Sequence, residues 1–143
     1  MNKRRQKKLA RRLVQSVMFG EVREVDALLR AGTDPDGRDA GGTTPLYAAS
    51  VHGATDKVRR LLAAGASPDT ESGHGDQGTP LCGAACWGHV ETVRALLEHG
   101  ADPNLREDQG TGWSPLRWAR NGPHQETVDA LLAAGARELE TAG

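Results

Sequence analysis

The residues with the clearest potential for chemistry are two cysteines and a histidine near the middle of the chain, Cys82, Cys86 and His89. Cysteines four positions apart share one face of a helix, so a soft metal ion could contact both thiolates. A zinc site takes four ligands, or three with one open position, and no second paired motif accompanies these residues. We therefore expect no metal and no cofactor, and interpret Cys82 as a small residue beside the core and Cys86 as a groove residue. A metal-dependent enzyme built on these three side chains is the least favoured alternative.

The histidines give no sign of nucleophilic catalysis. None has a serine or cysteine at a spacing that indicates a catalytic triad, and no glycine-rich loop follows a strand to hold a nucleotide. Catalysis also requires groups that converge in a cleft. We therefore predict that the protein is not an enzyme. The five histidines are His52, His74, His89, His99 and His124.

Positive charge is concentrated at the N-terminus. The first 12 residues contain seven basic side chains and no acidic one, so the remainder, with 11 basic and 19 acidic residues, has a formal charge of −8. A basic segment of this kind selects partners rather than a fold. Three interpretations stay open: the solvated start of a first helix, a contact site for an acidic partner or nucleic acid, and a nuclear import signal in a eukaryote. The basic residues of this arm are Lys3, Arg4, Arg5, Lys7, Lys8, Arg11 and Arg12.

An internal repeat indicates the architecture. Four valines recur at steps of 33, 35 and 35 residues, and a Leu-Leu pair and a glycine follow in the same steps. Thr-Pro-Leu or Ser-Pro-Leu begins three units, at residues 44, 79 and 114. So many shared positions indicate a repeat protein. The repeated residues are Val25, Val58, Val93 and Val128, then Leu28-Leu29, Leu61-Leu62, Leu96-Leu97 and Leu131-Leu132, then Gly32, Gly65, Gly100 and Gly135.

Each repeated position has a local structural role. A Thr or Ser hydroxyl before Pro caps a helix N-terminus, and Pro at the first helical position loses no needed N–H group. Val and the Leu pair, spaced i, i+3, i+4, form the apolar stripe of a second helix. The final Gly fits a left-handed C-terminal cap. The sequence therefore predicts two short helices per unit, joined by turns and longer loops.

These residues resemble the ankyrin repeat, and the resemblance covers roughly residues 11–137. Residues 79–104 match most fully, with Thr-Pro-Leu, paired alanines, a mid-repeat Gly, Val-x-x-Leu-Leu and Gly-Ala-Asp-x-Asn. The histidine that follows Thr-Pro-Leu in the family, and links neighbouring loops, is replaced by Tyr47, Cys82 and Arg117. The first and last units depart further, as expected of capping repeats whose outer faces meet water.

The resemblance implies an all-α, helix-turn-helix solenoid with finger loops between its repeats. We expect a single ankyrin-repeat domain at 11–143, preceded by a basic arm or helix lead-in at 1–10. The four predicted repeats lie at about 11–43, 44–78, 79–113 and 114–143. The loops at 70–78 and 105–113 carry two residues more than the usual repeat and are expected to be longer or less ordered fingers.

Ankyrin domains bind other proteins and rarely catalyse, so the resemblance implies a non-catalytic interaction module or adaptor. In this family the finger loops and the exposed ends of the first helices hold the partner on the concave face. Phe19, Trp87 and Trp113 fall at such positions, which favours a recognition patch because tryptophan is enriched at binding hot spots. Asp36, Asp39, Asp76, Glu107 and Asp108 give this face an acidic rim. The implied partner-binding residues are Met18, Phe19, Val51, His52, Cys86, Trp87 and Asn121 at helix ends, and Thr43, Asp76, Thr111 and Trp113 in the fingers.

Length and composition agree with a small protein-binding domain. A chain of 143 residues is expected to form one domain, and no stretch approaches the 18 apolar residues of a membrane span. The basic start is not followed by the apolar segment of a signal peptide. Two cysteines make no disulfide framework, which suits a reducing compartment. We expect a cytoplasmic monomer, or a nuclear one in a eukaryote, whose partner is another protein and not a membrane; nucleic acid bound by the arm is the alternative.

Overall fold

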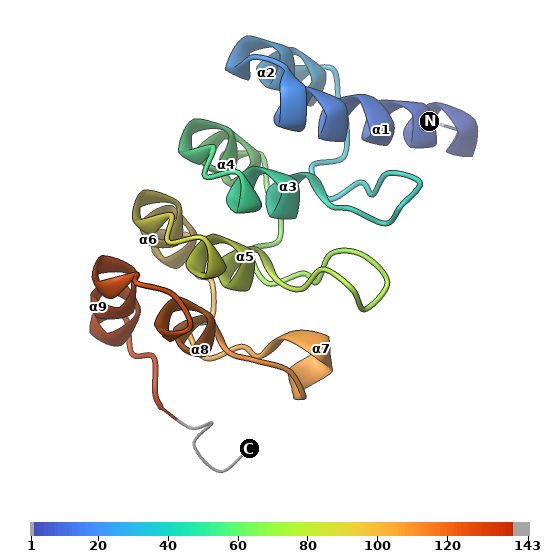
Figure 1. The fold of residues 1–143 in the computed structure, drawn as a ribbon. Coiled ribbons are helices and arrows are strands. Elements are labelled where there is room, and N and C mark those ends of the chain that lie inside the picture. The colour runs from blue at the N-terminus through green and yellow to red at the C-terminus, as the bar shows by residue number, and fades with distance from the viewer. Residues whose placement is uncertain (1, 139–143) are drawn as a thin grey trace.

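A stack of helix pairs makes up the computed structural model, which describes residues 2–138. Figure 1 shows the pairs stacked in chain order, with the longer loops projecting from one side. Within the described residues no strand forms beyond an isolated antiparallel bridge between Ser72 and Gly78. The predicted all-α solenoid is therefore confirmed. The predicted last repeat continues to residue 143, and its residues 139–143 lie outside the described part.

The helices form two rows. Neighbours within each row contact one another, and the two helices of each pair also pack together. The inner row contains α1 (Lys3–Phe19), α3 (Pro45–Val51), α5 (Pro80–Cys86) and α8 (Pro115–Arg120). The outer row contains α2 (Val22–Arg30), α4 (Thr55–Ala63), α6 (Val90–Glu98) and α9 (Gln125–Ala133), and a short helical turn, α7 (Glu107–Gly110), lies in the last long loop.

The predicted N-terminal caps explain why the inner helices begin where they do. The hydroxyls of Thr44, Thr79 and Ser114 accept hydrogen bonds from backbone N–H groups three residues on, each at 3.2 Å. The proline that follows each cap occupies the first turn of its helix, where its missing N–H is not needed.

The outer helices end at glycines with left-handed backbone conformation. Gly32, Gly65, Gly100 and Gly135 have φ values between +93° and +101°. Side chains rarely adopt this region, so glycine is the residue that ends such a helix without strain. The predicted left-handed caps are confirmed at all four positions.

The core is a column of aliphatic side chains running through the stack. The first leucine of each inner helix after α1 and the valine of each outer helix are buried in every unit. The second leucine of the repeated pair changes with position: Leu62 is buried, whereas Leu132 in α9, the last of the described helices, is 41% exposed. The core column contains Leu46, Leu81, Leu116, Val25, Val58, Val93 and Val128.

The first inner helix differs from the others in length. It has 17 residues, whereas α3, α5 and α8 have seven, seven and six. Its second half supplies Leu13, Val14 and Val17 to the core. Its first half continues the helix through the predicted basic arm, with Asn2 as an N-terminal cap that accepts from the Arg5 N–H at 2.8 Å.

Candidate partner-binding face

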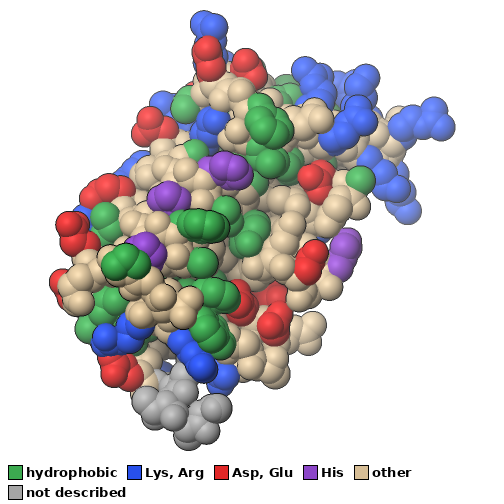
Figure 2. Space-filling model, in the orientation of Figure 1, with side chains coloured by type: hydrophobic (Ala, Val, Ile, Leu, Met, Phe, Trp, Pro, Cys, Tyr) green, Lys and Arg blue, Asp and Glu red, His purple; other side chains and the backbone are tan. Residues whose placement is uncertain are grey.

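Two aromatic side chains stand exposed at the C-terminal ends of inner helices. Trp87 caps α5 and is 62% exposed, and Phe19 ends α1 and is 82% exposed. Within the described residues Trp87 makes no ring stacking or cation–π contact. Figure 2 shows apolar side chains running down the middle of this side of the molecule, with histidines beside them.

A pair of histidines contacts the C-terminal ends of α3 and α5. His89 Nε2 lies 3.0 Å from the Val51 carbonyl oxygen, and His124 Nε2 lies 3.1 Å from that of Cys86. Because a carbonyl only accepts, Nε2 carries the proton in both rings. His89, just after α5, contacts the last residue of α3, and His124, just before α9, contacts the last residue of α5. The end of α5 that carries Trp87 is therefore held by contacts with both neighbouring units.

Glycine makes room for these rings. A Cβ on Gly53 would come within 2.6 Å of His89 Nδ1, and one on Gly88 within 2.4 Å of His124 Nδ1. Sequence reasoning missed this pair of contacts. The sequence does contain a sign of these contacts, because His89 and His124 are 35 residues apart, the same spacing as the repeat.

Three different side chains, Tyr47, Cys82 and Arg117, stand at the position where the family has histidine. The Tyr47 hydroxyl donates to the Gln77 carbonyl oxygen at 3.0 Å, and burial raises the pKa of this phenol, with Glu107 adding to the effect. Cys82 Sγ lies 3.6 Å from the Trp113 carbonyl oxygen, and the Arg117 guanidinium lies 4.3 Å over the Trp113 ring. Tyr47 and Cys82 therefore each reach the next finger, whereas Arg117 contacts the finger directly before its own helix.

The predicted finger residues divide into two kinds. Asp76 and Thr111 are exposed, although Asp76 Oδ1 accepts from the His74 N–H and Thr111 Oγ1 donates to the Asp108 carbonyl. Thr43 is half-buried and accepts from the Gln77 side-chain amide at 2.9 Å. The Thr43–Gln77 contact joins the first and second fingers, whereas the other two contacts lie within a single finger.

Trp113 is packed within the last finger. Its ring lies 4.6 Å from that of Trp118, with the two planes tilted by 49°. Trp118 Nε1 donates to Glu107 Oε1 at 2.9 Å. Burial raises the pKa of Glu107, the Trp118 hydrogen bond lowers it, and the nearby Asp108 and Glu71 carboxylates raise it again, for a net upward shift.

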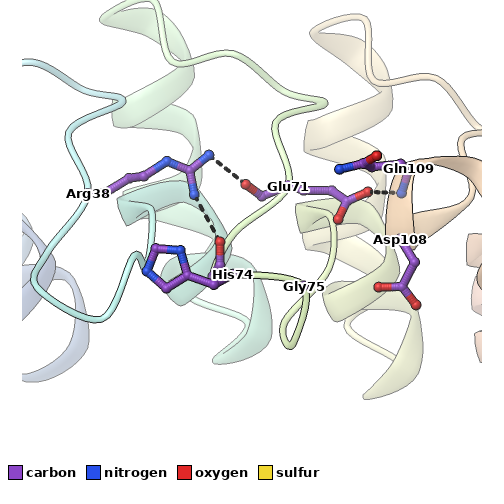
Figure 3. Close-up of a pocket in the computed structure, with 7 residues that line it drawn as sticks. Arg38, Glu71, His74, Gly75, Asp108 and Gln109 are labelled. Atoms are coloured by element: carbon purple, nitrogen blue, oxygen red, sulfur yellow. Dashed lines mark hydrogen bonds between the residues drawn. The ribbon is translucent and has the colours of Figure 1, made fainter.

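The tips of the fingers are joined by charged side chains around a hollow of about 550 Å³ (Figure 3). Arg38 donates to the carbonyl oxygens of Gly42 and Glu71, at 3.0 and 2.8 Å. The Glu71 carboxylate accepts from the Gln109 N–H at 2.6 Å. Asp108 and Gln109 both have positive φ, +54° and +57°, so this contact holds a strained turn.

The remaining predicted helix-end residues lie where the inner helices stop. Met18 is 36% exposed, His52 caps α3 with Nδ1 2.8 Å from the Ala48 carbonyl oxygen, and Asn121 caps α8 and is exposed. Val51 and Cys86 are half-buried, and their carbonyls hold the histidine pair.

The two cysteines are free thiols with different surroundings. Cys82 is buried and Cys86 is half-buried. Burial, and secondarily Glu107, raises the pKa of Cys86, which is the opposite of what a nucleophilic thiolate requires. No group of three or more histidine, cysteine or acidic side chains within residues 2–138 is arranged to hold a metal ion.

The geometry defines a helical repeat protein with an ordered row of finger loops. A family model for ankyrin repeats (three copies) matches residues 13–107 and residues 72–141. The chain therefore belongs to the ankyrin repeat family, whose members are generally protein–protein interaction modules and typically non-catalytic. The comparison with curated proteins gives no match. Among the described helices none is long and apolar enough to cross a membrane.

Proposed function

We propose that this protein is a non-catalytic adaptor that binds one partner protein on its concave face, with Trp87 as the anchor. The observation that carries the proposal is the 62% exposure of the Trp87 ring on a helix end that its neighbours hold firmly. The chain has five aromatic residues, so an indole left in solvent needs an explanation beyond core packing. Exposed tryptophan on a rigid surface is typical of a binding hot spot.

The surroundings of Trp87 support a protein partner. The neighbouring helix ends add His52 and the half-buried Val51, and the fingers add exposed polar groups such as Asp76 and Thr111. An apolar centre with a polar edge is the usual composition of a protein interface.

The experiment begins with capture of the partner from the source cell by affinity pull-down and mass spectrometry. Affinity of the purified pair is then measured for the natural protein, Trp87→Ala and Leu132→Ala. The matched control, Leu132, is an apolar side chain 41% exposed on the last outer helix. We expect Trp87→Ala to weaken binding by about 2 kcal/mol, or roughly thirtyfold, and the control to bind normally.

Circular dichroism of both variants checks that the helical content is unchanged. Weaker binding by a variant with unchanged helical content then reports the loss of a binding side chain and not the loss of the fold. Removal of residues 1–8 is expected to weaken this interaction less than Trp87→Ala, because exposed charges act mainly on encounter rate. If Trp87→Ala binds normally and the protein without residues 1–8 does not bind, the binding site lies on the arm and not on the concave face.

A further inference from the structure

The exposed face of α1 carries two stripes that change from basic to apolar along the helix. Arg4, Arg11 and Met18 are seven residues apart, and so are Arg5, Arg12 and Phe19. Residues seven apart lie on the same side of a helix. All six are exposed. The stripes run about 22 Å at 1.5 Å per residue, so they form a continuous surface the length of a short helix.

The basic part of this face is electrostatically unfavourable on its own. Within residues 2–138 none of the seven basic side chains of the arm forms an ion pair. Lys3 and Lys7, Arg4 and Lys8, and Lys8 and Arg12 are like charges at i, i+4, which destabilise a helix. The first turn contains no acidic residue, so the positive charges also oppose the helix dipole. An anionic partner would relieve both effects.

The surface is bordered by carboxylates on both sides. A hollow of about 620 Å³ separates Lys7, Lys8 and Arg11 from the first finger, where Asp39 lies. A second hollow, of about 410 Å³, lies beside Arg12 and Phe19 and is bordered by Glu24. Figure 2 shows the basic side chains gathered at the α1 end of the molecule. Arg38 also lines the first hollow, but its guanidinium donates to the Gly42 and Glu71 carbonyl oxygens, so the basic side chains of this hollow that have no partner among the described residues lie along α1.

The position of the basic side chains along α1 favours one class of anionic partner. A long nucleic acid carries its charge uniformly and would meet Asp39, Glu24 and a remainder of formal charge −8. The basic segment 3–12 offers no aromatic side chain on which a base could stack, and the exposed ring of this surface, Phe19, lies beyond it at the apolar end. A protein segment can place carboxylates over the arginines and apolar side chains over Met18 and Phe19.

We propose that the exposed face of α1 is a docking site for an acidic amphipathic helix of a protein. Its carboxylates lie against the arginine stripes, and its apolar residues, on one side of the helix, lie against Met18 and Phe19. This surface is additional to the one centred on Trp87. Its occupancy does not depend on Trp87, so the two proposals can fail separately.

The test uses a labelled synthetic helical peptide with glutamates at heptad positions in one half and leucines in the other. Binding is measured by fluorescence anisotropy at low and high salt. The double variant Arg5→Gln/Arg12→Gln removes two charges from one stripe. The matched control, Arg23→Gln/Arg30→Gln, removes the same charge from exposed positions on α2. Phe19→Ala tests the apolar end, and a single-stranded DNA of equal charge is the competing ligand.

We expect the Arg5/Arg12 variant to weaken peptide binding about tenfold, the effect of losing two exposed charge pairs, and the α2 control to leave it unchanged. Phe19→Ala should weaken binding of the leucine peptide but not of a peptide with alanine in that half. Because like charges are removed, the Arg5/Arg12 variant should melt no earlier than the natural protein. The proposal is overturned if the peptide does not bind, if both double variants lose equally, or if the DNA binds more tightly than the peptide.

Discussion

Trp87, at the end of an inner helix, and Trp113, in a finger, have opposite surroundings in the structure. Both were predicted on the concave face from the repeat register. Trp87 stands 62% exposed beyond α5 with no ring partner among the described residues. The Trp113 ring contacts both the Trp118 ring and the Arg117 guanidinium, and Trp118 is hydrogen-bonded to Glu107 of the same finger.

The difference follows from the elements that carry the two rings. Trp87 follows a regular inner helix whose end is fixed by histidine contacts, so its ring is not needed for packing. Trp113 precedes α8 at the end of a long loop with a strained turn, so its ring is part of what orders that loop. An exposed ring on a rigid element is available to a partner, whereas a ring that orders its own loop is already in use.

The largest expected effect is a loss of stability on removal of one ring of the packed Trp113–Trp118 pair. Trp118→Ala removes the ring under Trp113 and the hydrogen bond to Glu107, so it should lower the free energy of unfolding by about 2–3 kcal/mol. Trp87→Ala should change it by less than about 0.5 kcal/mol, as for other exposed positions. Urea denaturation of both variants measures the difference. Equal losses would remove the distinction between the two tryptophans.

The regularity of the unit that carries Trp87 can be tested at the glycine that follows its second helix. Gly100 ends α6 with φ +93°, and an added Cβ would meet nothing within 4 Å. Gly100→Val should therefore lower stability through backbone strain alone, by about 1–3 kcal/mol. Thermal denaturation checks this, with Gly100→Asn as the control that tolerates the left-handed region better. A valine variant as stable as the natural protein would contradict a strained cap.

The smallest effect concerns the finger that carries Trp113. Because the folded-state pKa of Glu107 is raised, the folded protein holds this proton more tightly than the unfolded chain does. Its contribution to stability is thus largest below the ordinary carboxyl pKa and falls as pH rises through the raised value. Urea denaturation of the natural protein and of Glu107→Gln gives the difference between their free energies of unfolding at each pH. This difference, natural protein minus variant, should decrease as pH rises from below the ordinary carboxyl pKa to above the raised one. A flat difference would show that the carboxyl is not perturbed.

The fold could be predicted from the sequence because its determinants are local and repeat. Thr79 before Pro80 caps a helix, Val93 and Leu96 form a stripe at helical spacing, and Gly100 closes the unit with positive φ. Each depends on neighbours within a few residues, and repetition confirms it several times over. The same register placed Trp87 at an exposed helix end.

Contacts between units were decided by the tertiary structure. The His89 bond to Val51 joins residues 38 apart, and Tyr47 reaches Gln77 across 30. Such pairs follow from how far one unit is turned and displaced on the next, which no local pattern states. The same stacking geometry left the Trp87 ring in solvent, whereas the contact between Trp113 and Trp118 joins residues only five apart. The sequence by itself determined which helices form and where they end. The stacking of the units decided which side chains make contacts between units and which stay exposed to a partner.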